Sequence, residues 1–262
     1  MRLGPVPREA PKAPEARSEM AEKAAVVTNV TEYAGAPAAM ALAADGFAVL
    51  CHDPSFTEAE ARTAFEASRP GCLAAAAQEP EALVAEAVAR LGRLDALVSN
   101  DPWPARRRRI GQATPEEYRA TIEALMVTLF RLAAAAAKVM EGQGGGRIVL
   151  VTSAAPLRPY PGFSMYASAR AGASGLAQAL GKELGAANIQ VNAVAPNFLY
   201  SETYYPKARW ADDPQYAERL KRMVPMQRLG RPEEVGALIA FLASGKADFV
   251  TAQVIPFTGG WP

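Results

Sequence analysis

Short, wholly apolar runs alternate with helix-patterned segments along almost the whole of this 262-residue chain. Strands are predicted at 23–30, 47–53, 94–101, 146–153, 189–196 and 252–260, and helices between them at 36–46, 57–68, 79–93, 114–140, 164–184 and 232–244. Strands without polar alternation are buried on both faces, which requires a parallel sheet covered by helices on each side. We therefore predict one α/β domain, a Rossmann-like doubly wound sheet, at residues 23–262. Residues 1–22 are Pro-rich and aperiodic, and are predicted to be a disordered tail.

Bulk composition limits the partners that this chain can have. The net charge of +1 gives no electrostatic footprint for a nucleic acid or a membrane, and we expect neither partner. No apolar run approaches the roughly 18 residues of a membrane span, and the first 20 residues contain no apolar signal segment. Cys51 and Cys72 do not form a disulfide framework, which favours the reducing cytoplasm. With His52 the only histidine, we expect no metal site.

Four predicted strands end in polar residues or proline. The last or next-to-last residues of these strands are Asn29, Asn100, Ser153 and Pro196. In an open parallel sheet, ligands bind outside the carboxyl ends of the strands. These four positions are therefore expected to face one site.

The segment after the first strand lacks the glycine-rich loop that a nucleotide-binding Rossmann protein needs. Between residues 26 and 45 the only glycine is Gly35, while Asn29 and Tyr33 stand where the first two glycines are expected. A phenol ring there would fill the space of a pyrophosphate, which needs close approach to the backbone. Asp53 could bind an adenosine ribose, but without the loop it is interpreted as a leftover or a loop-capping residue. We predict that no cofactor binds.

Ser153 precedes Tyr166 by thirteen residues, and Tyr166 opens a Tyr-x-x-x-basic pattern that ends in Arg170. This spacing resembles the active site of the short-chain dehydrogenases/reductases, and the likeness runs from about residue 23 onward. In that class the basic residue is normally Lys, which holds the ribose of the cofactor. Two further positions depart from the class: Asn197 replaces the glycine of a Pro-Gly pair, and the long helix at 114–140 lacks the catalytic Asn. These two changes and the missing glycine loop all affect features tied to nicotinamide chemistry.

Tyr166 and Arg170 are four residues apart, so they share one face of a helix. A free phenol titrates near pH ~10 and is a weak base at neutral pH. A permanently charged guanidinium nearby stabilises the phenolate and makes it a better base. Lys suits a ribose diol, whereas Arg suffices where only a phenol must be activated.

At these residues the chain resembles the halohydrin dehalogenases, which are cofactor-independent relatives of the short-chain dehydrogenases. The resemblance covers nearly the whole chain, including "VVTNV", "CHDPSF", "ALVSND", "YASARAG" and "APNFL". It implies that Tyr166 is the catalytic base, that Ser153 orients the substrate hydroxyl and that Arg170 activates Tyr166. The activity implied is conversion of vicinal haloalcohols to epoxides, with release of halide and a proton. Run in reverse, it would open epoxides with small linear anions such as azide, cyanide or nitrite.

The same resemblance implies a halide pocket and a homotetramer. The pocket would be formed by residues from three segments: Tyr33, Pro196, Asn197, Phe198, Leu199 and Tyr205. The backbone N–H groups of Phe198 and Leu199 are the implied donors, and Trp103 and Pro104 are expected to wall the substrate pocket, with plain packing as the alternative.

Other features admit more than one interpretation. The arginine run at 106–109 is either an anionic-partner patch or, as we favour, a solvated loop or subunit contact. His52 beside Asp53 is interpreted as structural, and Trp261 is a candidate contact with a neighbouring subunit. Two alternative functions stay open: an NAD(P)H-dependent short-chain reductase with an atypical cofactor loop, and a non-catalytic Rossmann-like scaffold.

Overall fold

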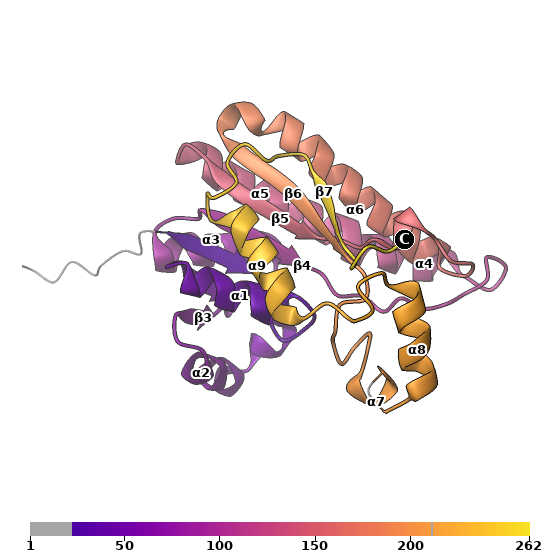
Figure 1. The fold of residues 1–262 in the computed structure, drawn as a ribbon. Coiled ribbons are helices and arrows are strands. Elements are labelled where there is room, and N and C mark those ends of the chain that lie inside the picture. Colours follow the sequence, from indigo (N-terminus) through magenta and orange to yellow (C-terminus); the bar gives the residue numbers. More distant parts are fainter. Residues whose placement is uncertain (1–22, 211) are drawn as a thin grey trace, which may run out of the picture.

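The computed structural model describes residues 23–210 and 212–262, so the predicted tail at 1–22 lies outside the described residues. Seven parallel strands form one sheet in the order β3-β2-β1-β4-β5-β6-β7 (Figure 1). The strands are β1 (Ala24–Val27), β2 (Ala48–Cys51), β3 (Cys72–Ala74), β4 (Ala96–Asn100), β5 (Gly146–Val151), β6 (Ile189–Pro196) and β7 (Val254–Phe257). This arrangement confirms the predicted doubly wound α/β fold.

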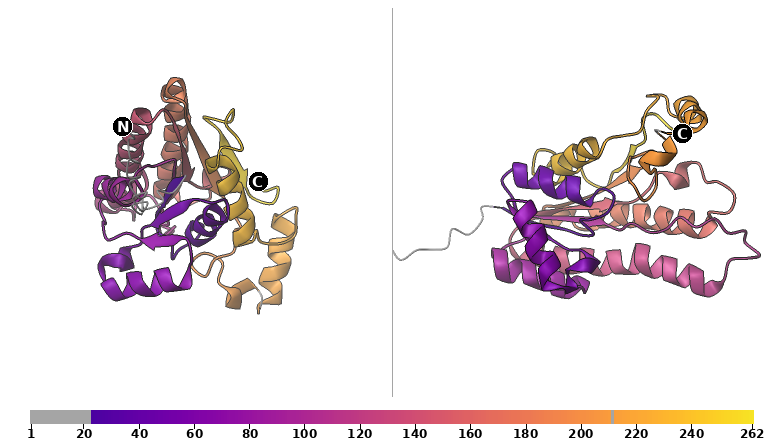
Figure 2. Two further views of the ribbon diagram at one scale, coloured as in Figure 1. Left: turned by 90° about the vertical axis from the view of Figure 1, so that its left-hand side faces the viewer. Right: turned by 90° about the horizontal axis from the view of Figure 1, so that it is seen from below.

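Helices cover both faces of the sheet, as the right-hand view of Figure 2 shows. On one face lie α1 (Gly35–Ala44) and α9 (Pro232–Ala243), with α2 (Ala59–Ser68) beside the β2–β3 edge; on the other lie α3 (Pro80–Leu91), α5 (Thr128–Gly142) and α6 (Ser164–Glu183). The chain also forms α4 (Pro115–Ile122), α7 (Lys207–Trp210), α8 (Pro214–Met223) and 3₁₀ turns at Pro54–Thr57, Ala155–Leu157 and Gly185–Ala187.

Burial explains why these apolar runs form central strands. Every residue of β1, β4 and β6 is buried, so each strand packs against helices on both faces. Val98 of β4 is paired with Val27 of β1 on one side and Val149 of β5 on the other, in continuous parallel register. The carboxyl ends of these strands therefore lie level along one edge.

The predicted helix at 114–140 is continuous but changes its winding. Thr114 caps α4 in a reciprocal capping box with Glu117, and a π-helical turn at Glu123–Val127 joins α4 to α5. The whole helix contains an 18-residue window with a mean hydropathy of 1.6, which by length and composition alone could cross a membrane. Its apolar side packs on the sheet through residues such as Leu129 and Met140, as the core helix of a Rossmann-like domain does.

Three elements differ from the sequence predictions. β3 was not predicted, and neither were α7 and α8, which lie in the connection between β6 and α9. Leu220 of α8 packs with Phe198 and Trp261 in a third apolar cluster, separate from the two that cover the sheet. This cluster places the β6–α9 connection over the carboxyl edge of the sheet.

Candidate active site

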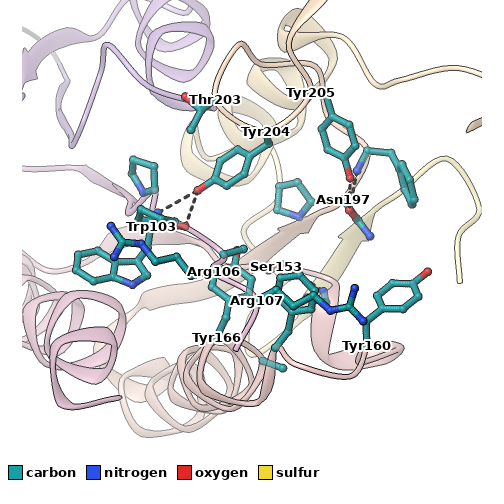
Figure 3. Close-up of a pocket in the computed structure, with 18 of the residues that line it drawn as sticks. Trp103, Arg106, Arg107, Ser153, Tyr160, Tyr166, Asn197, Thr203, Tyr204 and Tyr205 are labelled. Atoms are coloured by element: carbon teal, nitrogen blue, oxygen red, sulfur yellow. Dashed lines mark hydrogen bonds between the residues drawn. The ribbon is translucent and has the colours of Figure 1, made fainter. Parts of the chain in front are cut away.

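A cavity of about 1090 Å³ opens at the carboxyl edge of the sheet (Figure 3). Its walls come from the loops that follow β1, β4, β5 and β6, together with the start of α6, part of α8 and the C-terminus. The sequence-predicted residues that line it are Tyr33, Trp103, Pro104, Ser153, Tyr166, Pro196, Asn197, Phe198 and Tyr205. The topology therefore brings nine predicted residues to one cavity from positions up to 172 residues apart.

Ser153 stands two residues beyond the end of β5 and is almost buried. On either side of it, the N–H groups of Thr152 and Ala154 donate to the carbonyls of Val194 (2.8 Å) and Pro196 (3.2 Å). These backbone bonds extend the pairing with β6 and fix the Ser153 backbone. Its hydroxyl accepts a hydrogen bond from the N–H of Ala155 (3.1 Å), which leaves the hydroxyl proton available to a ligand.

Arg170 is buried behind Tyr166, with 3% of its surface exposed. One terminal nitrogen donates to the carbonyl of Val151 (3.2 Å) and the other to the carbonyl of Asp101 (2.6 Å), so the guanidinium ties α6 to the ends of β5 and β4. Its central carbon lies 5.2 Å from the centroid of the Tyr166 ring. A lysine has a single nitrogen and could not span both carbonyls while facing the ring.

The surroundings of Arg170 keep it charged. Burial alone would lower the pKa of Arg170, but attraction to Tyr166, Tyr204 and the Asp101 carboxylate raises it above its usual range. Burial also raises the pKa of Asp101, although its carboxylate accepts a hydrogen bond from the Ser99 hydroxyl (2.6 Å). The permanent positive charge beside the Tyr166 ring is therefore Arg170.

Two hydrogen-bond donors converge on one point in the predicted halide pocket. The backbone N–H of Phe198 and the hydroxyl of Tyr205 each donate to the side-chain oxygen of Asn197, at 2.9 Å. Phe198 has a left-handed backbone (φ 54°), which turns the chain sharply after β6. The carboxamide oxygen of Asn197 thus occupies the position where an anion would meet both donors.

Leu199 takes a different place from the other predicted halide residues. Its side chain is fully buried in the core against one face of the sheet and does not line the cavity. Within the part of the chain that the structure describes, its backbone N–H has no hydrogen-bond partner. Only that N–H can serve as a donor there.

Asn29 and Tyr33 adopt the backbone conformation that glycines would adopt, with φ of 48° and 51°. The side chain of Asn29 donates to the carbonyl of Asn100 (2.5 Å), and the Tyr33 ring faces the cavity beside Tyr204. Gly35 is required by packing, because a Cβ there would lie 2.5 Å from the Asn29 carbonyl oxygen. The loop thus keeps backbone angles that suit glycine, but Asn29 and Tyr33 carry side chains there, and the Tyr33 ring lies at the cavity.

Asp53 also fails to fit a dinucleotide. Its two carboxylate oxygens accept from the N–H and hydroxyl of Thr31 (3.0 and 2.6 Å) and of Ser55 (3.0 and 2.6 Å). With its acceptor sites engaged by the protein, it is a loop-capping residue rather than a ribose ligand. Neither the β1–α1 loop nor the end of β2 therefore fits NAD(P)H.

Sequence reasoning missed Tyr204, which joins two walls of the cavity. Its hydroxyl accepts from the N–H of Trp103 and donates to the Trp103 carbonyl, both at 3.0 Å, and its ring meets Tyr33 edge-on at 5.0 Å. Burial is the largest cause that raises the pKa of Tyr204 to about 12. The neighbouring Thr203 donates to Glu32 (2.5 Å), so this loop is tied to the β1–α1 loop as well.

Trp261, which we expected to be a candidate contact with a neighbouring subunit, packs inside its own chain. It is 3% exposed, lines the cavity and meets Phe198 edge-on at 5.6 Å. Its position near the end of the chain gave no sign of this contact. His52, in contrast, lies outside the cavity, where its Nδ1 accepts from the N–H of Asn29 (3.5 Å) and burial lowers its pKa.

Comparisons with known proteins match this chain both to reductases and to dehalogenases. A family model described as enoyl-(acyl carrier protein) reductase matches residues 18–262. Dehydrogenase/reductase SDR family member 4 of Homo sapiens is 31% identical, covering 94% of this chain and 90% of that protein. A 3-oxoacyl-[acyl-carrier-protein] reductase of Synechocystis sp. is 32% identical, covering 90% and 95%.

Two solved structures are more similar in sequence than these relatives. A halohydrin dehalogenase bound to ethyl (2S)-oxiran-2-ylacetate is 42% identical, with a TM-score of 0.89, and the match covers 92% of this chain and 97% of the other. A structure described as a dehalogenation enzyme is 40% identical, with a TM-score of 0.88 and coverage of 93% and 99%.

Proposed function

The chain belongs to the halohydrin dehalogenases, within the short-chain dehydrogenase/reductase family, and we propose that it converts vicinal haloalcohols to epoxides without a nucleotide cofactor. The observation that carries this proposal is the combination of a buried Arg170 behind Tyr166 with a Tyr33 side chain in the place of the pyrophosphate. Arg170 activates Tyr166 as a base, and the Tyr33 side chain removes the space for a nicotinamide cofactor, which would be the hydride donor.

The proposed reaction begins with the substrate hydroxyl held by the hydroxyl of Ser153. Tyr166, whose ring lies beside the guanidinium of Arg170, accepts the hydroxyl proton. The resulting alkoxide attacks the neighbouring carbon in line, so that a carbon–oxygen bond forms as the carbon–halogen bond breaks. The bonding pair leaves with the halide, and the proton on Tyr166 passes to solvent. If the cavity holds the oxygen, carbon and halogen in one line, this orientation lowers the activation free energy of the ring closure.

We propose that the leaving halide is held where the donors of the β6–α7 loop converge. In the structure the Asn197 carboxamide oxygen lies there, accepting from the Phe198 N–H and the Tyr205 hydroxyl. A halide would displace that oxygen, and the N–H of Leu199, which has no hydrogen-bond partner among the described residues, is a third donor for it. Rings of Tyr33 and Phe198 would present positive edges to the anion. The same donors would bind azide, cyanide or nitrite in the ring-opening direction.

We also propose a cytoplasmic homotetramer. Cys51 and Cys72 are both free, as in proteins of reducing compartments. Phe130 on α5 and Phe249 before β7 are exposed aromatic side chains, 52% and 103%, that subunit contacts would cover. Light scattering coupled to size exclusion would measure the assembly directly.

The decisive experiment measures free halide and pH after dialysed protein is mixed with a chloro- or bromo-alcohol, with no nucleotide added. We expect stoichiometric release of halide and protons. Tyr166→Phe should abolish it, whereas Tyr118→Phe, which removes an exposed hydroxyl bonded to Ser168, should not. Release of no halide from several haloalcohols would refute the proposal.

The second candidate function is an NAD(P)H-dependent reductase, because the matching family model and the curated relatives are described as reductases. Nucleotide binding separates the two candidates. On our proposal, titration with NADPH leaves the cofactor fluorescence unchanged. Saturable enhancement by the wild-type protein would support the reductase instead, and binding seen only in Tyr33→Gly would show that this side chain blocks the site.

A further inference from the structure

The cavity is larger than the proposed chemistry requires. Ligand pockets typically measure about 300–1,000 Å³, and this one lies just above that range at about 1090 Å³. The smallest vicinal haloalcohols would occupy only the part next to Ser153, Tyr166 and Asn197. The rest of the volume can hold a substituent on the substrate, which would extend toward the rim.

The rim carries an excess of positive charge. Arg106 and Arg107, in the loop after β4, and Arg219, in α8, all line the cavity. None of the three takes part in an ion pair within the described residues 23–210 and 212–262. Among the residues that line the cavity, the acidic one is Glu32, in the β1–α1 loop, which already accepts a hydrogen bond from Thr203. Three cations thus face one carboxylate.

The neighbouring arginines of the same run behave differently. Arg108 lies 3.6 Å from Glu117, and Arg109 is outside the main cavity. Arg107 is held at the rim by a hydrogen bond from its Nε to the carbonyl of Pro161 (3.2 Å), and its terminal nitrogens make no hydrogen bond to any residue that the structure describes. In Figure 3 the Arg106 side chain extends past Trp103 and the Arg107 side chain extends toward Tyr160, one on each side of the cavity.

We propose that the preferred substrates are haloalcohols and epoxides bearing a carboxylate, which is held at the rim in the positive field of Arg106 and Arg107 while the reacting carbons lie beside Tyr166. Arg219, stacked 5.3 Å above the Tyr216 ring, adds to the same positive field. A guanidinium pairs with a carboxylate through two parallel N–H donors, which suits it to this role better than an ammonium. The inference rests on the proposed dehalogenase activity and adds its substrate class.

The test compares two substrates that differ only in charge, 4-chloro-3-hydroxybutanoate and its methyl ester. The solved relative binds an ester of the corresponding epoxide, so the carbon skeleton suits such a site. For the wild type we expect kcat/KM to be higher for the carboxylate. The ratio of the two values should fall about three- to tenfold in Arg106→Gln/Arg107→Gln, the scale of one or two rim charge contacts. It should be partly restored in Arg106→Lys/Arg107→Lys, which keeps both positive charges but loses the paired N–H donors.

Arg109→Gln is the matched control, because it removes the same charge from the same run outside the main cavity; its ratio should equal that of the wild type. Halide release from the ester without a carboxylate preference would overturn this inference and leave the proposed function intact. An unchanged ratio in the double Gln variant, or a ratio lowered equally by Arg109→Gln, would overturn it too. Release from neither substrate would refute both.

Discussion

Tyr33 holds a left-handed backbone that suits glycine far better than an aromatic residue. A non-glycine residue in this region costs about 1–2 kcal/mol. The strained residue lies at the wall of the cavity, where the Tyr33 ring contacts Tyr204. Strain at such a position is typical of functional sites, where the surrounding structure enforces it.

The strain at Tyr33 can be measured with two variants that both remove the ring. Tyr33→Gly relieves the backbone, whereas Tyr33→Ala keeps it left-handed. We expect the Gly variant to be more stable than the Ala variant by about 1 kcal/mol, the reverse of their order in ordinary helices or strands. Urea unfolding gives both values. An Ala variant as stable as the Gly variant would show that the backbone is not constrained there.

Asp53 provides a pH-dependent test of the loop that replaces the cofactor site. Burial tends to raise its pKa, but the hydrogen bonds from Ser55 and Thr31 outweigh this and hold the pKa below its usual 3.8. Because the folded pKa is depressed, the stabilisation is complete above the unfolded pKa and is lost as the pH falls through the folded value. Asp53→Asn should therefore lower the free energy of unfolding by about 2 kcal/mol at pH 7, and by less near pH 3.

The matched control for Asp53 is Asp45→Asn. Asp45 pairs with Lys246 (2.8 Å) at an exposed position, where an ion pair contributes about 0–1 kcal/mol. Urea unfolding of the wild type, Asp53→Asn and Asp45→Asn at pH 7, 5 and 3 separates the effect of the buried carboxylate from that of the exposed ion pair. A loss in Asp53→Asn that stays constant across this range would contradict a contribution from the charged carboxylate.

Spacing alone predicted Ser153, Tyr166 and Arg170 as site residues, but it did not predict the residues that surround them. Ser153, Tyr166 and Arg170 form a pattern that is local along the chain, because a strand end and a helix start fix it. Tyr204 and Trp261 reach the cavity through irregular backbone, for which no periodicity exists to read. The hydrogen bond between Phe198 and Asn197 depends on a positive φ, and a sequence does not reveal that value at a non-glycine residue.

At the scale of elements, α6 is the part of the fold on which the proposed chemistry depends, because it carries both Tyr166 and Arg170. Its far end is fixed by close packing: a Cβ on Gly181 would lie 2.5 Å from the backbone nitrogen of Ala252. Gly175, in the same helix, is exposed and has open space around it. These two glycines have different reasons to be glycine.

Alanine substitution should separate those reasons. Gly181→Ala forces α6 away from the segment before β7 and should cost about 1–3 kcal/mol. Gly175→Ala should instead stabilise the protein by about 0.5–1 kcal/mol, because glycine is a poor helix former. Thermal and urea unfolding would measure both. Equal effects of the two substitutions would contradict the packing at Ala252.

The sequence predicted elements well where their signal was long and apolar. β6 (Ile189–Pro196) has the predicted bounds, since eight successive buried residues leave little choice. β3 has only three residues, Cys72–Ala74, and pairs on one side with β2, so its hydrophobic signal was too short. α8 is polar along most of its length, and the contact of Leu220 with the third apolar cluster decides its place.

On the scale of the whole molecule, the cavity closes only because three distant loops meet over the sheet. The loop after β6 contacts the β4 loop through Tyr204 and Trp103, and the β1–α1 loop through Thr203 and Glu32. Their anchor points are 101 and 171 residues apart. Because the sheet is rigid and buried, these few polar contacts determine how firmly the cavity wall is held.

Tyr204→Phe tests this closure, because it keeps the ring against Tyr33 and deletes the hydroxyl that serves both backbone groups of Trp103. Loss of these bonds should cost about 1–2 kcal/mol and loosen both loops. We expect KM for a haloalcohol to rise about three- to tenfold, and amide exchange to accelerate in 101–110 and 198–206 but not in β5. The control, Tyr200→Phe, removes a hydroxyl that bonds Glu202 within its own exposed loop, and should change neither. If Tyr204→Phe lowered kcat alone with unchanged exchange, the hydroxyl would act on the reaction rather than on closure.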